Sequence, residues 1–243
     1  MDWLDQYPYI AHRGFHDGSR VVENTANALI QAIDKSYAIE FDLQFLSNGT
    51  PILFHDAEFK RLCDDSTKVK DLNPKFLSLL SYSDGQKIIT LTEALKIVDG
   101  KVPLLIEIKR ETFQLKYLKP LIAILNTYQG KFSIQSFDPN ILKEVKKKSP
   151  NISIGQLMTN WFQTDISFLN KSIMNFAPFF NDLNFISVNQ EMSETIISIW
   201  ENVLSLPILF WTIKNQAQLN QLKTIGSGFI FEGFCPSPSA AEN

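Results

Sequence analysis

Short apolar segments alternate with helical patterns along most of these 243 residues, and this alternation predicts an α/β fold. Eight segments have the length and composition of buried strands when the second arm of one hairpin is set aside. Eight parallel strands, each followed by a helix, form a closed (β/α)8 or TIM barrel, which commonly occupies a chain of this length as one domain. An open doubly wound sheet is the alternative. It is disfavoured because His12, Arg13 and Gly14 follow the first strand, where a glycine-rich phosphate loop would be expected.

The predicted strands are apolar runs that end in polar or turn residues. They cover residues 9–12, 102–109, 132–137, 153–158, 185–189, 207–213 and 228–232, together with the first arm of a hairpin within residues 39–56. The predicted helices each have one apolar face, and most begin at a capping residue. They run onward from residue 25 and over residues 90–98, 113–128, 138–148, 193–204 and 216–225. An aromatic-rich segment, residues 161–180, separates the fifth and sixth strands.

The composition is that of an ordinary soluble globular protein, with 44% hydrophobic and 20% charged residues. A net charge of −3 gives no electrostatic footprint for nucleic acid. We see neither a transmembrane segment nor a signal peptide, and therefore expect a cytoplasmic protein that forms a single domain over residues 1–243. Two distant cysteines, Cys63 and Cys235, suit a reducing compartment, with one disulfide as the alternative. The oligomeric state is left open.

The hairpin within residues 39–56 carries two acids on its first arm and a histidine at the end of its second. Glu40 and Asp42 are two residues apart on a strand, so their side chains share a face. A tight turn centred on Asn48 and Gly49 would place His55 directly opposite Asp42 on that face. This register predicts that two carboxylates and an imidazole converge. Residues 57–89, which follow, are polar and irregular, and we interpret them as a short insertion.

Polar side chains also lie at the carboxyl ends of the first and third predicted strands. Because the reactive residues of a TIM barrel gather at the carboxyl ends of its strands, we expect Glu107 to join Glu40 and Asp42. Three carboxylates without paired cysteines favour a hard cation, Mg²⁺ or Ca²⁺, over Zn²⁺. The alternative is that these acids are surface groups or pair with Arg13 and Lys109.

Two of the three histidines, His12 and His55, lie at the ends of apolar strands, whereas His16 lies in a loop. Two imidazoles beside a cation suggest a general acid and a general base. Arg13 and Lys109 are suited to contacting a phosphate. Together these groups would suit displacement at phosphorus, and without a Walker loop a nucleotide-dependent kinase is disfavoured.

The ordered motifs IAHRG, ENT, IEFDLQ, NGTPILFHD, TLTEAL, PLLIEIK, SFDP and FWTI resemble those of the glycerophosphodiester phosphodiesterases. The resemblance extends from Tyr9 to about Glu232 and implies a TIM-barrel hydrolase. Such an enzyme uses a divalent cation to cleave glycerophosphodiesters into an alcohol and glycerol 3-phosphate, a reaction of lipid and glycerol metabolism. The resemblance also implies that residues 57–89 help to cover the barrel mouth. In the family mechanism that it implies, the glycerol 2-hydroxyl attacks first.

The resemblance assigns a role to each matching residue. By motif, His12 and His55 correspond to catalytic residues and Glu40, Asp42 and Glu107 to metal ligands. The residues that correspond to substrate-binding positions are Arg13, Lys109, Glu23, Asn24 and Trp211. Trp211 is as readily explained as part of the core.

Two other functions remain open on the same scaffold. One is a lysophospholipase D-like phosphodiesterase, with aromatic side chains such as Trp161, Phe162, Phe179 and Phe180 meeting an acyl chain. The other is a barrel that binds phosphodiesters without cleaving them, which the complete set of acids and histidines disfavours.

Overall fold

The computed structural model describes residues 1–18, 20–159, 181–192, 197 and 203–237. The aromatic-rich segment 161–180 and most of the helix predicted over 193–204 lie outside these residues. The chain forms two compact units, one of residues 11–132 and one of residues 1–10 with 133–243. Strands and helices alternate along both, and the predicted fold class, an α/β barrel of the TIM type, is confirmed. The prediction of a single domain stays a prediction.

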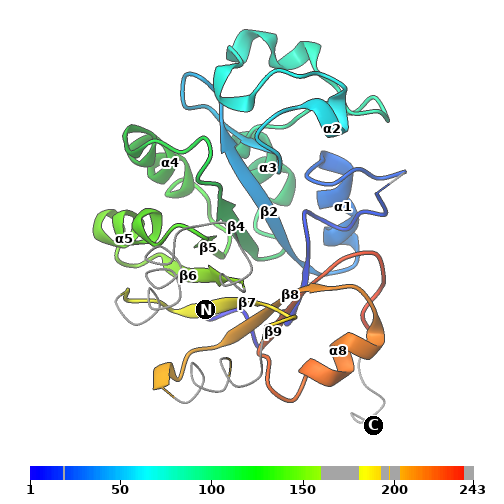
Figure 1. The fold of residues 1–243 in the computed structure, drawn as a ribbon, viewed down its shortest axis with the longest axis vertical. Helices are drawn as coiled ribbons and strands as arrows, with labels where there is room; N and C mark the ends of the chain where they lie inside the picture. The colour runs from blue at the N-terminus through cyan, green and yellow to red at the C-terminus, as the bar shows by residue number, and fades with distance from the viewer. Residues whose placement is uncertain (19, 160–180, 193–196, 198–202, 238–243) are drawn as a thin grey trace. The chain divides into compact units, whose positions relative to one another are not determined.

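The unit of residues 11–132 is built around one fully buried strand, β2 (Ala38–Phe45), seen in blue in Figure 1. It pairs in parallel with β4 (Leu104–Ile108), and Asp42 lies opposite Glu107 in that register. Helix α1 (Ala26–Asp34) begins where the Thr25 hydroxyl accepts a hydrogen bond from Ala28 N. Helix α3 (Leu91–Val98) begins with the predicted capping box of Thr90 and Glu93. Both helices bury one apolar face.

The helix predicted over residues 113–128 is shorter in the structure. A 3-10 turn, η3 (Leu115–Tyr117), precedes α4 (Leu118–Leu125). Pro120 lacks the N–H that would bond to the carbonyl of residue 116, so the α-helix begins within one turn of it.

The hairpin has a different register from the predicted one. Strand β2 pairs antiparallel with β3 (Pro51–Leu53), and Leu43 lies opposite Leu53. Phe54 N donates to Asp42 O at 3.1 Å, so Phe54, not His55, lies opposite Asp42. The prediction was wrong by one residue because the loop is longer than a two-residue turn: Leu46 N bonds to Thr50 O at 3.0 Å. Gly49 adopts a φ of +88° in this loop, as in hairpins with one left-handed residue.

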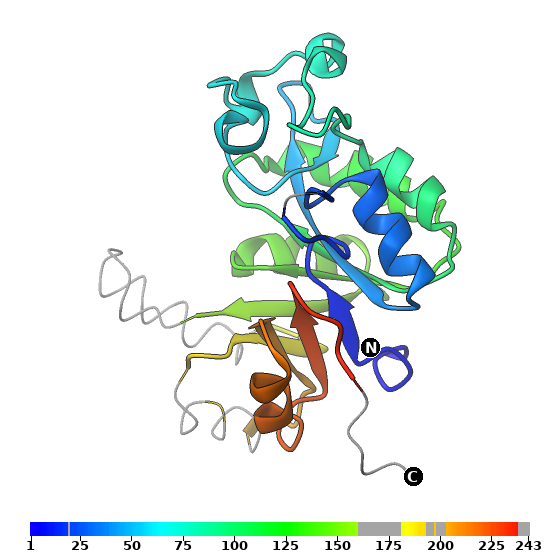
Figure 2. The ribbon, with the colours of Figure 1, turned by 90° about the vertical axis from the view of Figure 1, so that its right-hand side faces the viewer.

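The segment predicted as irregular, residues 57–89, contains short helices that lie beyond the hairpin (Figure 2, cyan). They are α2 (Lys60–Cys63), η1 (Val69–Asp71) and η2 (Pro74–Leu79). The segment packs on the hairpin through an apolar cluster in which Phe59, Val69 and Tyr82 meet Ile52 and Phe54. Phe54 therefore stabilises the insertion, and the chain leaves the β-ladder at this residue.

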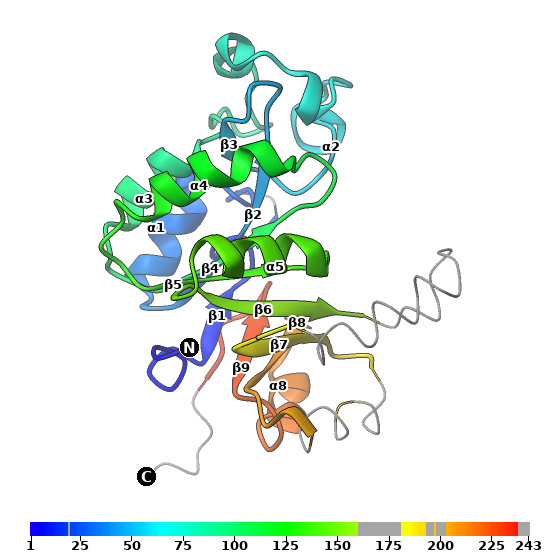
Figure 3. The same cartoon turned by 90° about the vertical axis from the view of Figure 1, so that its left-hand side faces the viewer.

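The other unit contains most of β1 (Tyr9–Ala11), most of β5 (Phe132–Ser136) and the four strands that follow. The last strands are β6 (Ser153–Met158), β7 (Phe185–Asn189), β8 (Ile208–Ile213) and β9 (Gly228–Phe231), and each pairs in parallel with its neighbour in sequence (Figure 3). Asp138 caps α5 (Pro139–Lys148), as predicted, and Asn215 caps α8 (Gln216–Leu222). Among the described residues, no helix has the length and apolarity needed to span a membrane.

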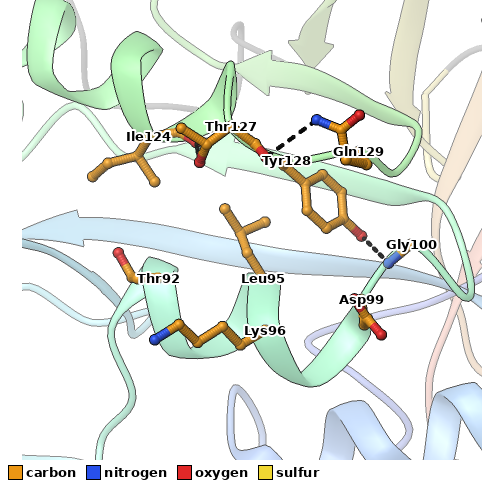
Figure 4. Close-up of a pocket in the computed structure, with 9 residues that line it drawn as sticks. All are labelled: Thr92, Leu95, Lys96, Asp99, Gly100, Ile124, Thr127, Tyr128 and Gln129. Atoms are coloured by element: carbon orange, nitrogen blue, oxygen red, sulfur yellow. Dashed lines mark hydrogen bonds between the residues drawn. The ribbon is translucent and has the colours of Figure 1, made fainter.

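A pocket of about 250 Å³ lies between α3 and α4 (Figure 4). Leu95 and Ile124 line it, and the Tyr128 hydroxyl accepts a hydrogen bond from Gly100 N at 3.1 Å at one end. None of the predicted site residues lines this pocket.

Candidate active site

Three buried carboxylates form the centre of the candidate site. Glu40 and Asp42 follow each other on one face of β2, and Glu107 is the β4 residue opposite Asp42. Each offers an oxygen, and these oxygens lie within 4.8 Å of one another. The residues are 1%, 1% and 8% exposed, respectively. Three acids at this depth require positive charge nearby, because an isolated buried carboxylate is costly.

The three acids differ in pKa because Asp42 is paired with both Lys109 and Arg13, whereas Glu107 is paired with Lys109 alone among the ion pairs described for it. Burial is the largest cause that raises the pKa of Glu107 to about 7, and Asp42 adds to the increase. Burial and the neighbouring acids likewise raise the pKa of Glu40 well above its ordinary value. Burial also acts to raise the pKa of Asp42, but Lys109 and Arg13 outweigh it and hold that pKa well below its usual range.

Lys109 and Arg13 lie on either side of Asp42. Lys109 Nζ lies 3.3 Å from Asp42 Oδ1 and 2.9 Å from Glu107 Oε1. Arg13 Nε lies 3.2 Å from Asp42 Oδ2, and its backbone N donates to Glu40 Oε2 at 3.0 Å. Arg13 Nη1 also donates to Glu23 Oε1 at 2.7 Å. Both predicted phosphate-binding cations therefore lie at the acidic cluster.

Asn24 holds Asp42 in place by two hydrogen bonds. Its Nδ2 donates to Asp42 Oδ2 at 3.0 Å, and Asp42 N donates to its Oδ1 at 3.2 Å. Asn24 is fully buried with a φ of +57°, a conformation that asparagine tolerates better than most residues. Asn24 and Glu23 thus contact the acidic cluster and its cations directly. Their roles in substrate binding stay predictions.

Both predicted catalytic histidines lie within electrostatic range of Asp42, whose pKa each of them lowers. His55 follows β3 and is 33% exposed in its side chain, and His12 follows β1. Burial is the largest cause that lowers the pKa of His55, and Lys109 and Arg13 lower it further. A neutral imidazole is therefore favoured at position 55, which is the form that accepts a proton.

Three residues that contact this site were not singled out from the sequence. Gln44 Nε2 donates to the carbonyls of His55 and Asp56, at 2.9 and 3.1 Å. Asp56 Oδ1 lies 2.7 Å from His55 Nδ1, and Arg61 bonds to Asp56. The two-residue period of β2 could have identified Gln44, which shares a face with Glu40 and Asp42. Nothing in the local pattern distinguishes Arg61.

Trp211 belongs to the other compact unit. Its indole Nε1–H donates to Ser187 O at 3.2 Å, and its ring lies edge-on to Phe137 at 5.7 Å. The proposed substrate role of Trp211 stays a prediction. The four aromatic residues considered for contact with an acyl chain all lie outside the described residues: Trp161, Phe162, Phe179 and Phe180.

The donor set fits a divalent cation. All three ligand groups are carboxylates, the oxygens that Mg²⁺ and Ca²⁺ prefer. Burial and repulsion from Asp42 and Glu107 raise the pKa of Glu40, and a bound cation would relieve that repulsion. An α/β barrel with such a cluster, two imidazoles and two cations has the components of an acid–base site for an anionic substrate.

The chain belongs to the glycerophosphoryl diester phosphodiesterase family, whose model matches residues 12–231. One relative is the glycerophosphodiester phosphodiesterase of Caldanaerobacter subterraneus subsp. tengcongensis, 31% identical over 61% of this chain and 65% of its own length. Another is glycerophosphodiester phosphodiesterase 1 of Bos taurus, 25% identical over 65% of this chain and 50% of its own length. The matched part of this chain thus spans between half and two thirds of these curated relatives.

Solved structures share the fold over nearly the whole chain. A phosphodiesterase from Oleispira antarctica, in complex with the product sn-glycerol-3-phosphate, matches with a TM-score of 0.76 and 20% identity, over 93% of this chain and 92% of its own. The glycerophosphodiester phosphodiesterase of Thermotoga maritima matches with a TM-score of 0.73 and 20% identity, over 93% and 94%. At these identities the likeness concerns the fold alone.

Proposed function

We propose that this protein is a metal-dependent glycerophosphodiester phosphodiesterase, which hydrolyses a glycerophosphodiester to an alcohol and glycerol 3-phosphate. The observation that carries the proposal is the buried cluster of Glu40, Asp42 and Glu107, flanked by Lys109 and Arg13. Family membership supplies the substrate class.

Each group of the site has a part in this reaction. Glu40, Asp42 and Glu107 would hold one cation, Mg²⁺ or Ca²⁺, which when bound supplies charge that stabilises the phosphoryl oxygens. Arg13 and Lys109 add positive charge beside the phosphate. One of His12 and His55 accepts the proton of the attacking oxygen as it bonds to phosphorus. The other donates a proton to the departing alcohol oxygen as its bond to phosphorus breaks.

Hydrolysis of glycerophosphocholine in the presence and absence of a chelator tests this proposal. We expect the chelator to abolish the release of choline and glycerol 3-phosphate, and added Mg²⁺ or Ca²⁺ to restore it. Full activity in chelator would refute the metal assignment. Choline release from lysophosphatidylcholine but not from glycerophosphocholine would favour a lysophospholipase D-like activity. Binding without turnover of any glycerophosphodiester would favour a non-catalytic barrel.

The proposed substrate is a small molecule, and the reaction would serve lipid and glycerol metabolism. We also propose a cytoplasmic location, which the free thiols of Cys63 and Cys235 support. Cell fractionation checks it, and recovery of the protein with an extracellular fraction would contradict it.

A further inference from the structure

Arg61, on helix α2 of the insertion, joins two carboxylates that belong to different parts of the candidate site. Its Nε donates to Asp56 Oδ2 at 2.6 Å and its Nη2 to Asp56 Oδ1 at 3.2 Å. Towards Glu23, its Nη2 donates to Oε1 at 2.7 Å and its Nη1 to Oε2 at 3.1 Å. The guanidinium therefore forms two-bond contacts with both acids, which only its planar fork of donors can do.

On the first side, the contact continues to His55. Asp56 Oδ1 lies 2.7 Å from His55 Nδ1. Arg61 is the strongest influence that keeps the pKa of Asp56 low, against the opposing effect of burial, and an ionised carboxylate only accepts hydrogen bonds. The hydrogen of the neutral His55 ring must then lie on Nδ1, which leaves Nε2 as the nitrogen that accepts a proton.

On the second side, the contact continues to Arg13. Glu23 Oε1, which accepts from Arg61 Nη2, also accepts from Arg13 Nη1 at 2.7 Å. Arg13 in turn lies 3.2 Å from Asp42. One residue of the insertion is thus connected to a predicted acid–base group and to a predicted phosphate-binding group.

The main chain at His55 is held by Gln44, whereas the imidazole ring is held by its contact with Asp56. Gln44 Nε2 bonds to the carbonyls of His55 and Asp56, and Gln44 Oε1 accepts from the Thr112 hydroxyl at 2.6 Å. Gln44 is fully buried, so these bonds fix the backbone whatever the orientation of the ring. The hydrogen bond described for the His55 ring is the one with Asp56, and Asp56 in turn accepts from Arg61.

We propose that Arg61 is a positioning residue for the proposed phosphodiesterase reaction: through Asp56 it sets the tautomer and orientation of His55, and through Glu23 it holds Arg13. The proposal rests on the proposed function. It assigns the insertion a part in catalysis beyond covering the site. The competing interpretation is that Arg61 only fastens α2 to the barrel, as a surface ion pair would.

The neighbouring residue provides a matched control for that interpretation. Lys60 lies on the same short helix, is 56% exposed in its side chain, and pairs only with the exposed Asp64 among the contacts described for it. Such surface pairs contribute little to stability. The variants Arg61→Ala, Arg61→Lys, Asp56→Asn and Lys60→Met would therefore be compared with the wild type.

We expect Arg61→Ala and Asp56→Asn each to lower kcat by at least ~10-fold, the usual scale for partners that orient a reactive group, while Lys60→Met leaves it unchanged. The kcat of Arg61→Lys should lie between those of the wild type and Arg61→Ala, because an ammonium cannot form two parallel hydrogen bonds with each of two carboxylates. Guanidinium ions added at a concentration that leaves the fold intact should restore part of the activity of Arg61→Ala but not that of Asp56→Asn. Urea unfolding of each variant separates a loss of positioning from a loss of folding.

Nitrogen NMR of the His55 ring gives a readout that does not depend on turnover. In the wild type we expect the Nδ1-protonated form, assigned by its loss in His55→Gln, and in Arg61→Ala and Asp56→Asn a mixture of tautomers. If the wild type hydrolyses no glycerophosphodiester, the proposed function fails but the tautomer still decides the positioning role. An unchanged tautomer in folded Arg61→Ala, or a wild-type kcat, would overturn the proposal.

Discussion

Replacing Glu107 by glutamine is expected to remove a pH dependence from the stability of the metal-free protein. The pKa of Glu107 is raised by burial to about 7, from an ordinary value of 4.5. Between these values the folded chain holds a proton that the unfolded chain has released, so the free energy of unfolding falls as pH rises. At about 1.4 kcal/mol per pKa unit, the wild type should lose about 3 kcal/mol over this range relative to Glu107→Gln.

The assay is urea unfolding of both proteins in excess chelator, at intervals between about pH 4 and pH 8. The quantity to plot is the difference between their free energies of unfolding, in which titrations shared by the two proteins largely cancel. Loss of the Glu107 charge also relieves the repulsion on Glu40, which shifts the difference in the same direction. Glu58→Gln, which changes an exposed carboxylate, serves as the control. A difference between wild type and Glu107→Gln that stays constant over this range would refute the reasoning.

Two further predictions follow from the contacts described above. His12→Ala and His55→Ala should each lower the rate of phosphodiester hydrolysis by at least ~100-fold, the scale of acid–base groups, and a variant that keeps its rate would remove that histidine from catalysis. Thr90→Ala removes the capping box in which Glu93 N donates to the Thr90 hydroxyl at 3.3 Å and Thr90 N donates to Glu93 Oε2 at 2.8 Å. It should destabilise the protein by about 1 kcal/mol, seen as a lower urea midpoint with an unchanged slope, and an unchanged midpoint would contradict it.

Much of the fold could be predicted because it depends on local chemistry. Thr25, Thr90 and Asp138 each begin a helix, since their side chains accept hydrogen bonds from the backbone in the first turn. The meeting of Glu40, Asp42 and Glu107 was equally predictable. The two-residue period aligns the first two, and parallel pairing brings the carboxyl end of β4 beside them.

The hairpin register could not be obtained by the same reasoning. Asn48 and Gly49 favour a turn, but the same dipeptide serves loops of two or three residues, and these differ by one residue in register. Packing outside the hairpin favours the observed register. Phe54 joins an apolar cluster with Phe59 and Tyr82, and these two residues belong to the insertion, which the sequence pattern showed only as irregular.

The wrong register nevertheless left His55 within range of Asp42, and this indicates what controls its position. If the β-ladder determined it, a shift of one residue would turn His55 to the opposite face. The last ladder hydrogen bond described for this arm joins Phe54 N to Asp42 O, however, and beyond it the chain is held by Gln44, which bonds to the carbonyls of His55 and Asp56. His55 and Asp42 thus lie near each other for a different reason from the hairpin register on which the prediction was based. Gln44→Leu, which abolishes these bonds without introducing a charge into β2, should therefore perturb His55 more than a substitution within the turn.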